Sequence, residues 1–341
     1  MTGPGARVLT FAVLVACLMC SLWAAVRSTP SYDPAADRPA LMRDAELYRA
    51  IASSVAEGQS YYSAALSLQR QNGFPVKPFF TVRLPTLTML VASLGPALPA
   101  LAWGLFLAIV VLWHRRLGEE SAAIRLSSVA PVAILGGSML YMDALMFADV
   151  WCGLLVSLAL TFRTTSTRAG AALAALAFRE FAAGFAAICL LKAIAERERR
   201  ATIIAAGGLL IFALGITCHA LIITGLVHDR DVASQGWMGL MGPSGVIDAI
   251  RLTTPLHYLP YTVAACIGFL PLLGWLDHDR VAFAWFLGMV ALLAIVARPD
   301  NFYWAGAMLP LYFAGLAFVP RALRSLKSGA TSPESATSRV S

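Results

Sequence analysis

Two adjacent charged residues, Arg179 and Glu180, lie inside an otherwise apolar stretch that runs from about residue 169 to residue 191. A charged side chain at the centre of a bilayer costs roughly 2.5–3.5 kcal/mol on insertion scales. Two neighbouring charges therefore need a water-filled cavity, a mutual partner or a bound ligand. This pair constrains the fold strongly, because the helices around it must enclose polar chemistry at membrane depth.

The composition places that stretch in a membrane protein. The chain of 341 residues is 59% hydrophobic and only 13% charged, with a mean hydropathy of +0.72. Soluble domains carry about 25% charged residues. The sequence therefore predicts an all-α polytopic membrane protein. All six cysteines fall in apolar runs, and we interpret them as small hydrophobic residues rather than as disulfide or zinc ligands.

Six apolar runs are long enough to cross a bilayer, for which about 17–25 residues are needed. These runs are Val8–Val26, Leu84–Trp113, Thr202–Leu226, Tyr258–Trp275, Val281–Ala297 and Phe302–Val319. Two further apolar blocks, between Leu126 and Leu191, are broken near their middles, one by Asp143 and Asp149 and the other by Arg179-Glu180. Each block is either one helix with buried charge or two short helices that meet at a polar turn.

The distribution of charge decides between these two readings. With both blocks as hairpins, the chain has about ten transmembrane helices and cytoplasmic termini. The outside pieces then hold 11 Lys/Arg and 12 Asp/Glu, against 15 and 7 in the cytoplasmic pieces. If only the Arg179-Glu180 block were one helix, the basic cluster Lys192, Arg197, Arg199 and Arg200 would be translocated, which violates the positive-inside bias. The basic residues thus gather on the cytoplasmic side, which argues against nucleic acid as a partner.

The ends of the chain and its domain organisation follow from the same pattern. Residues 1–320 are predicted to form a single transmembrane domain, and residues 321–341 a disordered cytoplasmic tail rich in Ser and Thr. We interpret the first run as a retained anchor, because it exceeds a usual signal-peptide core; a cleavable signal peptide is the alternative.

Three outside segments carry polar residues. They are a long first loop at about 27–83, a second large loop at about 228–257 and a short turn at 298–301. In the first loop, Leu47, Ile51 and Val55 recur every four residues between Asp44 and Gly58. This spacing predicts an amphipathic helix that lies along the membrane surface, with Asp44 at its start.

An ordered set of motifs runs from about residue 40 to Pro320. The motifs are Asp44 with Tyr48 and Ala52, Gly58 with Tyr61-Tyr62, Gly73-Phe-Pro75, Arg83-Leu-Pro-Thr-Leu, Phe178-Arg179-Glu180, Gly236-Trp237 and Arg298-Pro-Asp-Asn-Phe-Tyr-Trp304. In their order and topological side they resemble the polytopic GT-C glycosyltransferases, most of all the bacterial members linked to cell-surface glycopolymer formation.

The resemblance implies a multi-pass enzyme of a bacterial-type inner membrane whose active site faces outside. Such an enzyme transfers a sugar from a polyprenyl-phosphate donor to a glycan or glycolipid acceptor of the cell envelope, with inversion at the anomeric carbon and a first-loop acid as base. One departure matters. Many GT-C enzymes carry two adjacent acids in this loop, whereas Asp44 and Glu46 are two apart and face different sides of a helix.

The expected reaction assigns roles to the acidic residues. A carboxylate must take the proton of the acceptor hydroxyl. Asp44 is the first candidate for this base and Glu46 the second; the alternative for Asp44 is that it only caps the helix. Asp143 and Asp149, at the first hairpin, are expected to support the acid site or bind a divalent cation, with turn capping as an equal alternative. No cofactor is required by the sequence beyond that open metal question.

Positive charge must stabilise the departing phosphate. Arg179 is the first candidate ligand, with Glu180 orienting it; the alternative is an ion pair of Arg179 with Glu180 or Asp149 that holds the turn. Arg83 and Lys77 are further candidates, with interfacial snorkelling as their alternative. Arg298 is another, in the turn with Asp300 and Asn301.

Aromatic residues of the outside loops are candidates for sugar and acceptor contacts. These are Tyr48, Tyr61, Tyr62 and Trp237, with Tyr303 and Trp304 in addition. Aromatic residues also gather at membrane interfaces for other reasons, and this alternative applies most to Trp304. We interpret His219 as a satisfied intramembrane histidine.

The competing function is a transporter or flippase of lipid-linked sugars. A transporter predicts helix breaks near the midplane in paired, symmetric halves. The sequence shows no such symmetry and has a first outside loop of over fifty residues, and both features favour the enzyme. A non-catalytic membrane scaffold is a third possibility, and an acyltransferase is disfavoured because His219 has no partner acid in the sequence.

Overall fold

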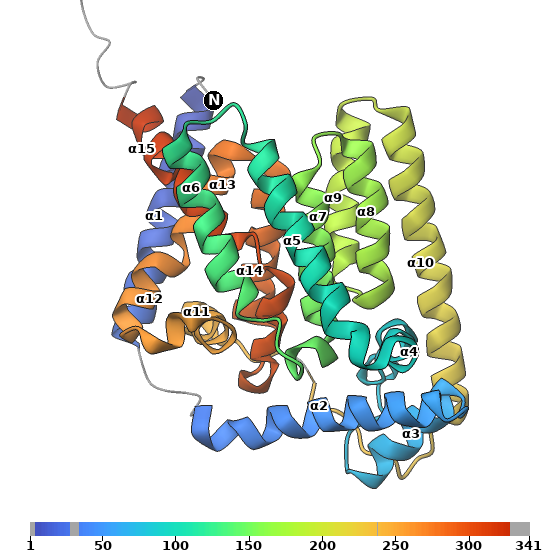
Figure 1. The fold of residues 1–341 in the computed structure, drawn as a ribbon. Coiled ribbons are helices and arrows are strands. Elements are labelled where there is room, and N and C mark those ends of the chain that lie inside the picture. The colour runs from blue at the N-terminus through green and yellow to red at the C-terminus, as the bar shows by residue number, and fades with distance from the viewer. Residues whose placement is uncertain (1–3, 28–33, 237, 328–341) are drawn as a thin grey trace, which may run out of the picture.

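A computed structural model describes residues 4–27, 34–236 and 238–327, which form a bundle of helices above one long helix that lies across its end (Figure 1). The α-helices are α1 (Pro4–Val26), α2 (Pro34–Ala56), α3 (Tyr61–Gln71), α4 (Pro85–Leu94), α5 (Leu98–Arg116), α6 (Ala122–Pro131), α7 (Ala148–Thr161), α8 (Thr165–Phe178), α9 (Ala182–Ala195), α10 (Arg199–Leu226), α11 (Gly242–Thr253), α12 (Tyr261–Gly268), α13 (Leu270–His278), α14 (Arg280–Ile295) and α15 (Val319–Lys327). Short helical turns are η1 (Phe79–Thr81), η2 (Gly95–Ala97), η3 (Val132–Gly136), η4 (Ala144–Met146), η5 (Pro255–Tyr258), η6 (Pro299–Ala307) and η7 (Tyr312–Phe318). In these residues the one β-type contact is a bridge between Lys77 and Ala233.

Several helices have the length and apolar composition of membrane spans. Among the described residues these are Gly5–Val26, Phe79–Arg116 and Arg199–Leu226. A fourth arises if Pro299–Ala307 and Tyr312–Leu326, which meet at a bend of 64°, are taken together. The other apolar helices are shorter than 18 residues. The all-helical class and the membrane character expected from the sequence are therefore present, while the number of ten spans stays a prediction.

Both interrupted blocks are divided into two helical parts, as the charge count predicts. The first consists of α6 with η3, a break containing Asp143, and then α7. The second consists of α8 and α9, which are separated by residues 179–181. The backbone at Arg179 is extended (φ −147°, ψ 127°), so α8 ends there. Helices of 14 residues cover only about 21 Å, which is less than the roughly 30 Å of a hydrocarbon core.

This shortness shapes the end of the bundle. The 28 residues of α10 extend about 42 Å, and α10 reaches beyond the ends of α8 and α9 toward α2 (Figure 1). The polar turn at Arg179 is therefore recessed into the bundle, and α4 and α2 lie across the recess.

Three runs predicted to be single helices are interrupted. Leu84–Trp113 is divided by η2, where Gly95 has a positive φ of 50° and precedes Pro96. Tyr258–Trp275 is divided at Phe269, two residues before Pro271, and Phe302–Val319 between η6 and η7. Proline explains these breaks, because it has no N–H donor and its ring clashes with the preceding turn. Composition alone did not reveal them, because hydropathy is the same for straight and broken helices.

The first outside loop contains two packed helices. The predicted amphipathic helix is present as α2, but it begins at Pro34, ten residues before Asp44. The side chains of Leu47 and Ile51 are buried against α3 and the end of α10. The second loop contains α11, whose residues Gly245–Ile250 are buried. Residues 321–327, which the sequence analysis assigns to the tail, are helical in α15, and residues 328–341 lie outside the described residues.

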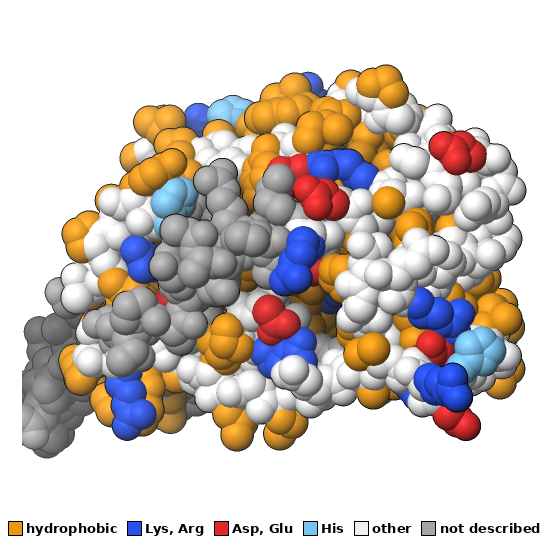
Figure 2. All heavy atoms as spheres, turned by 90° about the horizontal axis from the view of Figure 1, so that it is seen from below, with side chains coloured by type: hydrophobic (Ala, Val, Ile, Leu, Met, Phe, Trp, Pro, Cys, Tyr) orange, Lys and Arg blue, Asp and Glu red, His pale blue; other side chains and the backbone are white. Residues whose placement is uncertain are grey.

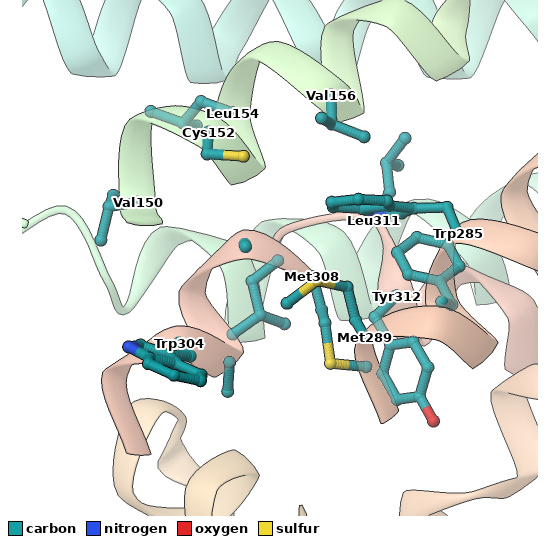
Figure 3. Packing of buried hydrophobic residues seen from close by; sticks show 14 of the residues in the cluster. Val150, Cys152, Leu154, Val156, Trp285, Met289, Trp304, Met308, Leu311 and Tyr312 are labelled. Atoms are coloured by element: carbon teal, nitrogen blue, oxygen red, sulfur yellow. The ribbon is translucent and has the colours of Figure 1, made fainter. Parts of the chain in front are cut away.

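The main core runs through the centre of the bundle, where α7, α14 and the bent pair η6–η7 meet (Figure 3). Contacts here are close because small residues stand where backbones approach. A Cβ on Gly153 of α7 would lie 2.1 Å from the carbonyl oxygen of Gly306 in η6. Small residues at helix contacts are typical of membrane bundles. All six cysteines are free, and Cys17, Cys152 and Cys189 are buried.

Candidate active site

Charged residues from four segments meet where the short helices end, on the side covered by α2. We call Asp44, Arg83, Asp149, Arg179 and Glu180 the polar cluster. They come from α2, the entry to α4, the start of α7 and the α8–α9 turn. Seen from the side of α2, acidic and basic side chains are interspersed along the middle of this face (Figure 2).

Arg179 is held at the centre of the polar cluster. Its side chain is 1% exposed, Nε donates to Asp149 Oδ1 at 2.9 Å, and Nη1 donates to Glu180 Oε1 at 3.1 Å. The guanidinium carbon lies 4.3 Å from the ring centroid of Phe181. The ion-pair alternative raised by the sequence therefore describes the contacts of Arg179. The remaining donor, Nη2, is buried and has no hydrogen-bond partner among the described residues.

Arg83 is held by neutral groups instead. Its Nε donates to the hydroxyl of Tyr48 at 3.3 Å and its Nη2 to the hydroxyl of Tyr303 at 3.0 Å. The Tyr61 hydroxyl donates to the backbone carbonyl oxygen of Arg83. Among the described residues no carboxylate lies within ion-pair distance of Arg83. The charge of Arg83 is thus oriented without being neutralised by contact, which suits a ligand for an anion.

Arg83 lines a small recess with Tyr48, Thr88, Phe147 and Asp149. The ring of Tyr48 packs edge-on against Phe147, with centroids 5.8 Å apart. The recess therefore joins the free side of Arg83 to the buried carboxylate that holds Arg179. Tyr48 and Phe147 form an aromatic wall of the recess, and its other lining residues include the apolar Leu84, Leu87, Val91, Met146 and Ala148.

Asp44 lies in the interior of α2, so the alternative that it only caps the helix is wrong. Its side chain is half-buried and makes no hydrogen bond with any described residue. Burial raises the pKa of Asp44 to about 6; the charge of Arg83 acts in the opposite direction, and Asp300 raises the pKa further. A carboxylate with this pKa is ionised at neutral pH and is a stronger base than an ordinary aspartate. Glu46, two residues on, is exposed and faces away.

Two predicted residues are paired elsewhere. Asp143 accepts from Arg49 of α2, which ties α2 to the η3–α7 connection. Arg298 pairs with Asp300 at 3.1 Å and 2.8 Å, and its Nη1 donates to the carbonyl oxygen of Gly236 at 3.1 Å. The charge of Arg298 is thus neutralised by Asp300. Its hydrogen bond to the Gly236 carbonyl oxygen ties this turn to the second outside loop.

Most of the predicted aromatic contacts have structural partners. Tyr61 is buried and bonds to the backbone at Arg83. The Tyr62 hydroxyl lies 3.2 Å from His219 Nδ1, and His219 Nε2 lies 3.0 Å from the Val82 carbonyl oxygen, so His219 is satisfied as expected. Lys77 Nζ donates to two backbone carbonyls of the second loop. Trp237 lies outside the described residues.

The described residues contain no group of three or more His, Cys, Asp or Glu side chains arranged to hold a metal ion. Asp143 and Asp149, the pair considered for a cation, each contact a different arginine. The divalent-cation requirement therefore stays an open prediction.

Two further aromatic residues complete the polar cluster. Tyr303 orients Arg83 through its hydroxyl, and Phe147 packs against Tyr303 with centroids 4.8 Å apart. The sequence predicts Tyr303 as a sugar or acceptor contact and does not predict that it binds Arg83. Nothing in the sequence marks Phe147, because its role depends on the turn that brings the start of α7 beneath α2.

Comparison of the chain with known proteins finds no matching family model, no similar curated protein and no similar solved structure. The resemblance to GT-C glycosyltransferases therefore stays a prediction from the motifs.

Proposed function

We propose that the protein is a membrane glycosyltransferase that moves a sugar from a polyprenyl-phosphate donor to an envelope acceptor on the outer face, with inversion. The observation that carries the proposal is Arg83, an oriented cation without a carboxylate in contact, beside a half-buried aspartate with a raised pKa. A transferase of this kind needs a phosphate ligand and a base at one membrane-depth site.

In this proposal Asp44 takes the proton of the acceptor hydroxyl as the new glycosidic bond forms. The bond between the anomeric carbon and the phosphate oxygen breaks on the opposite side of the sugar. Arg83 stabilises the negative charge that grows on the departing phosphate. Arg179, fixed by Asp149 and Glu180, offers the buried donor Nη2 to the same group. Arg83 thus takes precedence over Arg179, which the sequence favoured.

A hydrophobic groove beside the polar cluster is suited to the lipid chain of the proposed donor. A cavity of about 260 Å³ lies between α2, α4 and the turn before α7. Its walls are mainly apolar, formed by residues such as Ala52, Val91, Leu98 and Met146, with Arg49 at one side. Met146 and Val91 also line the recess at Arg83, so the groove and the recess are adjacent. A polyprenyl chain in the groove would place its phosphate near Arg83.

The proposed topology has about ten spans in a bacterial-type inner membrane, with both termini cytoplasmic and α2 outside. Figure 1 supports it in one respect: the turn between α8 and α9 faces the end of the bundle where α2 lies, and the N-terminus lies at the other end.

The test is sugar transfer by purified, detergent-solubilised protein from a panel of polyprenyl-phosphate sugars. The variant Asp44→Asn, which lacks the proposed base, is measured beside it. We expect one donor to give a product with inverted anomeric configuration. Donor translocation in liposomes without transfer from any donor would favour the transporter and overturn the proposal.

A further inference from the structure

A second cavity, of about 290 Å³, lies beyond the aromatic wall of the polar cluster. Phe147 lines both this cavity and the recess at Arg83, and Tyr303 lines the cavity while its hydroxyl binds Arg83. The opposite wall is formed by the end of α11 and by η5. The cavity therefore shares a wall with the proposed reaction site without containing its charges.

The lining of this cavity includes no Lys, Arg, Asp or Glu among the described residues. It combines apolar residues with hydroxyl groups and exposed aromatic rings. Tyr258, at its edge, is 80% exposed, and its ring centroid lies 3.8 Å from that of His257. An uncharged cavity with an exposed aromatic rim does not attract anions, and it offers ring faces for stacking.

Three polar groups of the lining offer acceptors because their protons are already used, whereas the hydroxyl groups of Tyr258 and Tyr303 can still donate. Ser138 Oγ donates to the Leu135 carbonyl at 2.7 Å, and Thr253 Oγ1 donates to the Ala249 carbonyl at 2.8 Å. His257 Nδ1 lies 2.9 Å from the Thr254 carbonyl oxygen, which can only accept, so Nδ1 carries the proton and Nε2 is an acceptor.

A lining that combines such acceptors with tyrosine hydroxyls suits a ligand that both donates and accepts hydrogen bonds. Sugar hydroxyls donate and accept, whereas carboxylates and phosphates only accept. A polar ligand group that finds no partner in a buried site weakens binding, because it loses its hydrogen bonds to water. The lining thus disfavours an acidic ligand because it contains no cation and because the acceptors at Ser138, Thr253 and His257 cannot pair with a carboxylate.

We infer that this cavity binds the acceptor as a neutral carbohydrate, with a sugar ring on Tyr258 and sugar hydroxyls donating to Thr253, Ser138 and His257. That the bound carbohydrate is the acceptor rests on the proposed transferase function. The binding itself does not require transfer. If Tyr258 bound no sugar, its exposure would be that of an aromatic residue at a membrane interface.

The test is saturation-transfer NMR with purified protein and no donor present. The probes are neutral trisaccharides of glucose, galactose, mannose and arabinose, and trigalacturonic acid as the acidic counterpart of galactotriose. We expect millimolar or tighter binding of at least one neutral trisaccharide and none of the acid. Equal binding of trigalacturonic acid, or no binding by any neutral probe, would overturn the inference.

Two variants locate the binding. Thr253→Val removes one acceptor and should weaken binding about three- to tenfold, and Tyr258→Ala should weaken it about tenfold. Thr224→Val is the matched control, because its Oγ1 also donates within its helix at 2.8 Å, to Ala220, on the exposed face of α10. Unchanged binding in both cavity variants contradicts the inference. Binding without transfer from any donor would instead retain the cavity and reject the transferase.

Discussion

Arg168 and Arg179 lie on the same helix, α8 and its C-terminal cap, yet their surroundings differ. They are eleven residues apart, or about 16 Å along the helix, and their side chains are 4% and 1% exposed. Arg168 uses all its donor nitrogens: Nε bonds to the Phe162 carbonyl at 2.9 Å, and Nη1 and Nη2 bond to Asp279. Arg179 leaves Nη2 without a partner.

The groups around each arginine repeat this difference. Asp279 also binds Arg116 at 2.9 Å and caps α14 by accepting from the Val281 amide at 3.0 Å. Beside Arg179, the indole nitrogen of Trp304 is buried and has no hydrogen-bond partner among the described residues, and Asp44 is half-buried without a hydrogen bond to any described residue. Buried polar groups are almost always satisfied, so unsatisfied ones need an explanation. His278 Nε2, near Asp279, is also unsatisfied, but the arginines at that end use their donors on partners. We therefore propose that the Arg168 end holds the bundle together and that the Arg179 end is prepared for a ligand.

The largest expected effect separates the two acids of α2. Asp44→Asn should lower the rate of sugar transfer about 10²- to 10⁴-fold, because it removes the general base. Glu46→Gln, which changes an exposed side chain, should leave the rate nearly unchanged. Transfer rates of the purified variants check this. Folding is controlled by melting temperature, which should not fall in Asp44→Asn because the ionised form of Asp44 is disfavoured by burial. Full turnover of Asp44→Asn would refute the base assignment.

A second pair of variants removes one carboxylate beside Arg168 and one beside Arg179. Asp279→Asn should destabilise the protein by about 3 kcal/mol, because it leaves Arg116 and Arg168 buried without a carboxylate. Its transfer rate per folded molecule should not change. Asp149→Asn should destabilise less, since Arg179 keeps Glu180, but should reduce transfer. Thermal unfolding in detergent and transfer rates measure both effects. The opposite pattern, with transfer lost only in Asp279→Asn, would reverse the roles of the two ends.

The pH dependence of transfer tests whether Asp44 must be ionised. Asp44 must be ionised to accept a proton, and its pKa is raised to about 6 by burial. The rate should therefore be level above about pH 7 and fall about tenfold per pH unit below 6. A pH–rate profile of the wild type between pH 5 and 8 is the measurement. A level profile down to pH 5 would show that Asp44 does not titrate as the base.

The smallest effect concerns the orientation of Arg83. Tyr303→Phe removes the 3.0 Å hydrogen bond to Nη2 and keeps the ring against Phe147. A hydrogen bond donated by a charged guanidinium contributes about 1.5–3 kcal/mol, so we expect transfer to fall about ten- to a hundredfold. Tyr61→Phe, which loses only a contact to the Arg83 backbone, is the comparison variant. An equal or larger loss in Tyr61→Phe would show that the backbone, not Tyr303, positions the guanidinium.

Much of the arrangement was predictable from residue patterns. The charge count predicted the turns at Asp143 and at Arg179, because an uninterrupted helix would have placed basic residues on the wrong side. The four-residue repeat of Leu47 and Ile51 predicted the buried face of α2. These signals are local, and the chain has few ways to satisfy them in a membrane.

Other features depended on contacts between distant segments. The start of α2 at Pro34 was missed because the apolar repeat begins only near Asp44. The partner of Asp143 is Arg49, 94 residues away, and no pattern relates them. Arg179 was preferred over Arg83 as phosphate ligand because charge within an apolar stretch is conspicuous. Which of the two is already neutralised depends on Asp149 and Glu180, and so on how α7 packs beside α8.

The proposed function requires that the Arg83–Arg179 end of the bundle binds a lipid phosphate. The most direct measurement is the affinity of the purified protein for polyprenyl phosphate without a sugar, in wild type, Arg83→Gln and Arg163→Gln. Arg163 is the control, an exposed arginine near the opposite end whose one ion pair with a described residue is a 3.5 Å contact to Glu119. We expect one bound lipid phosphate, with affinity reduced at least about tenfold in Arg83→Gln and unchanged in Arg163→Gln. Equal affinity in Arg83→Gln and wild type would contradict the account.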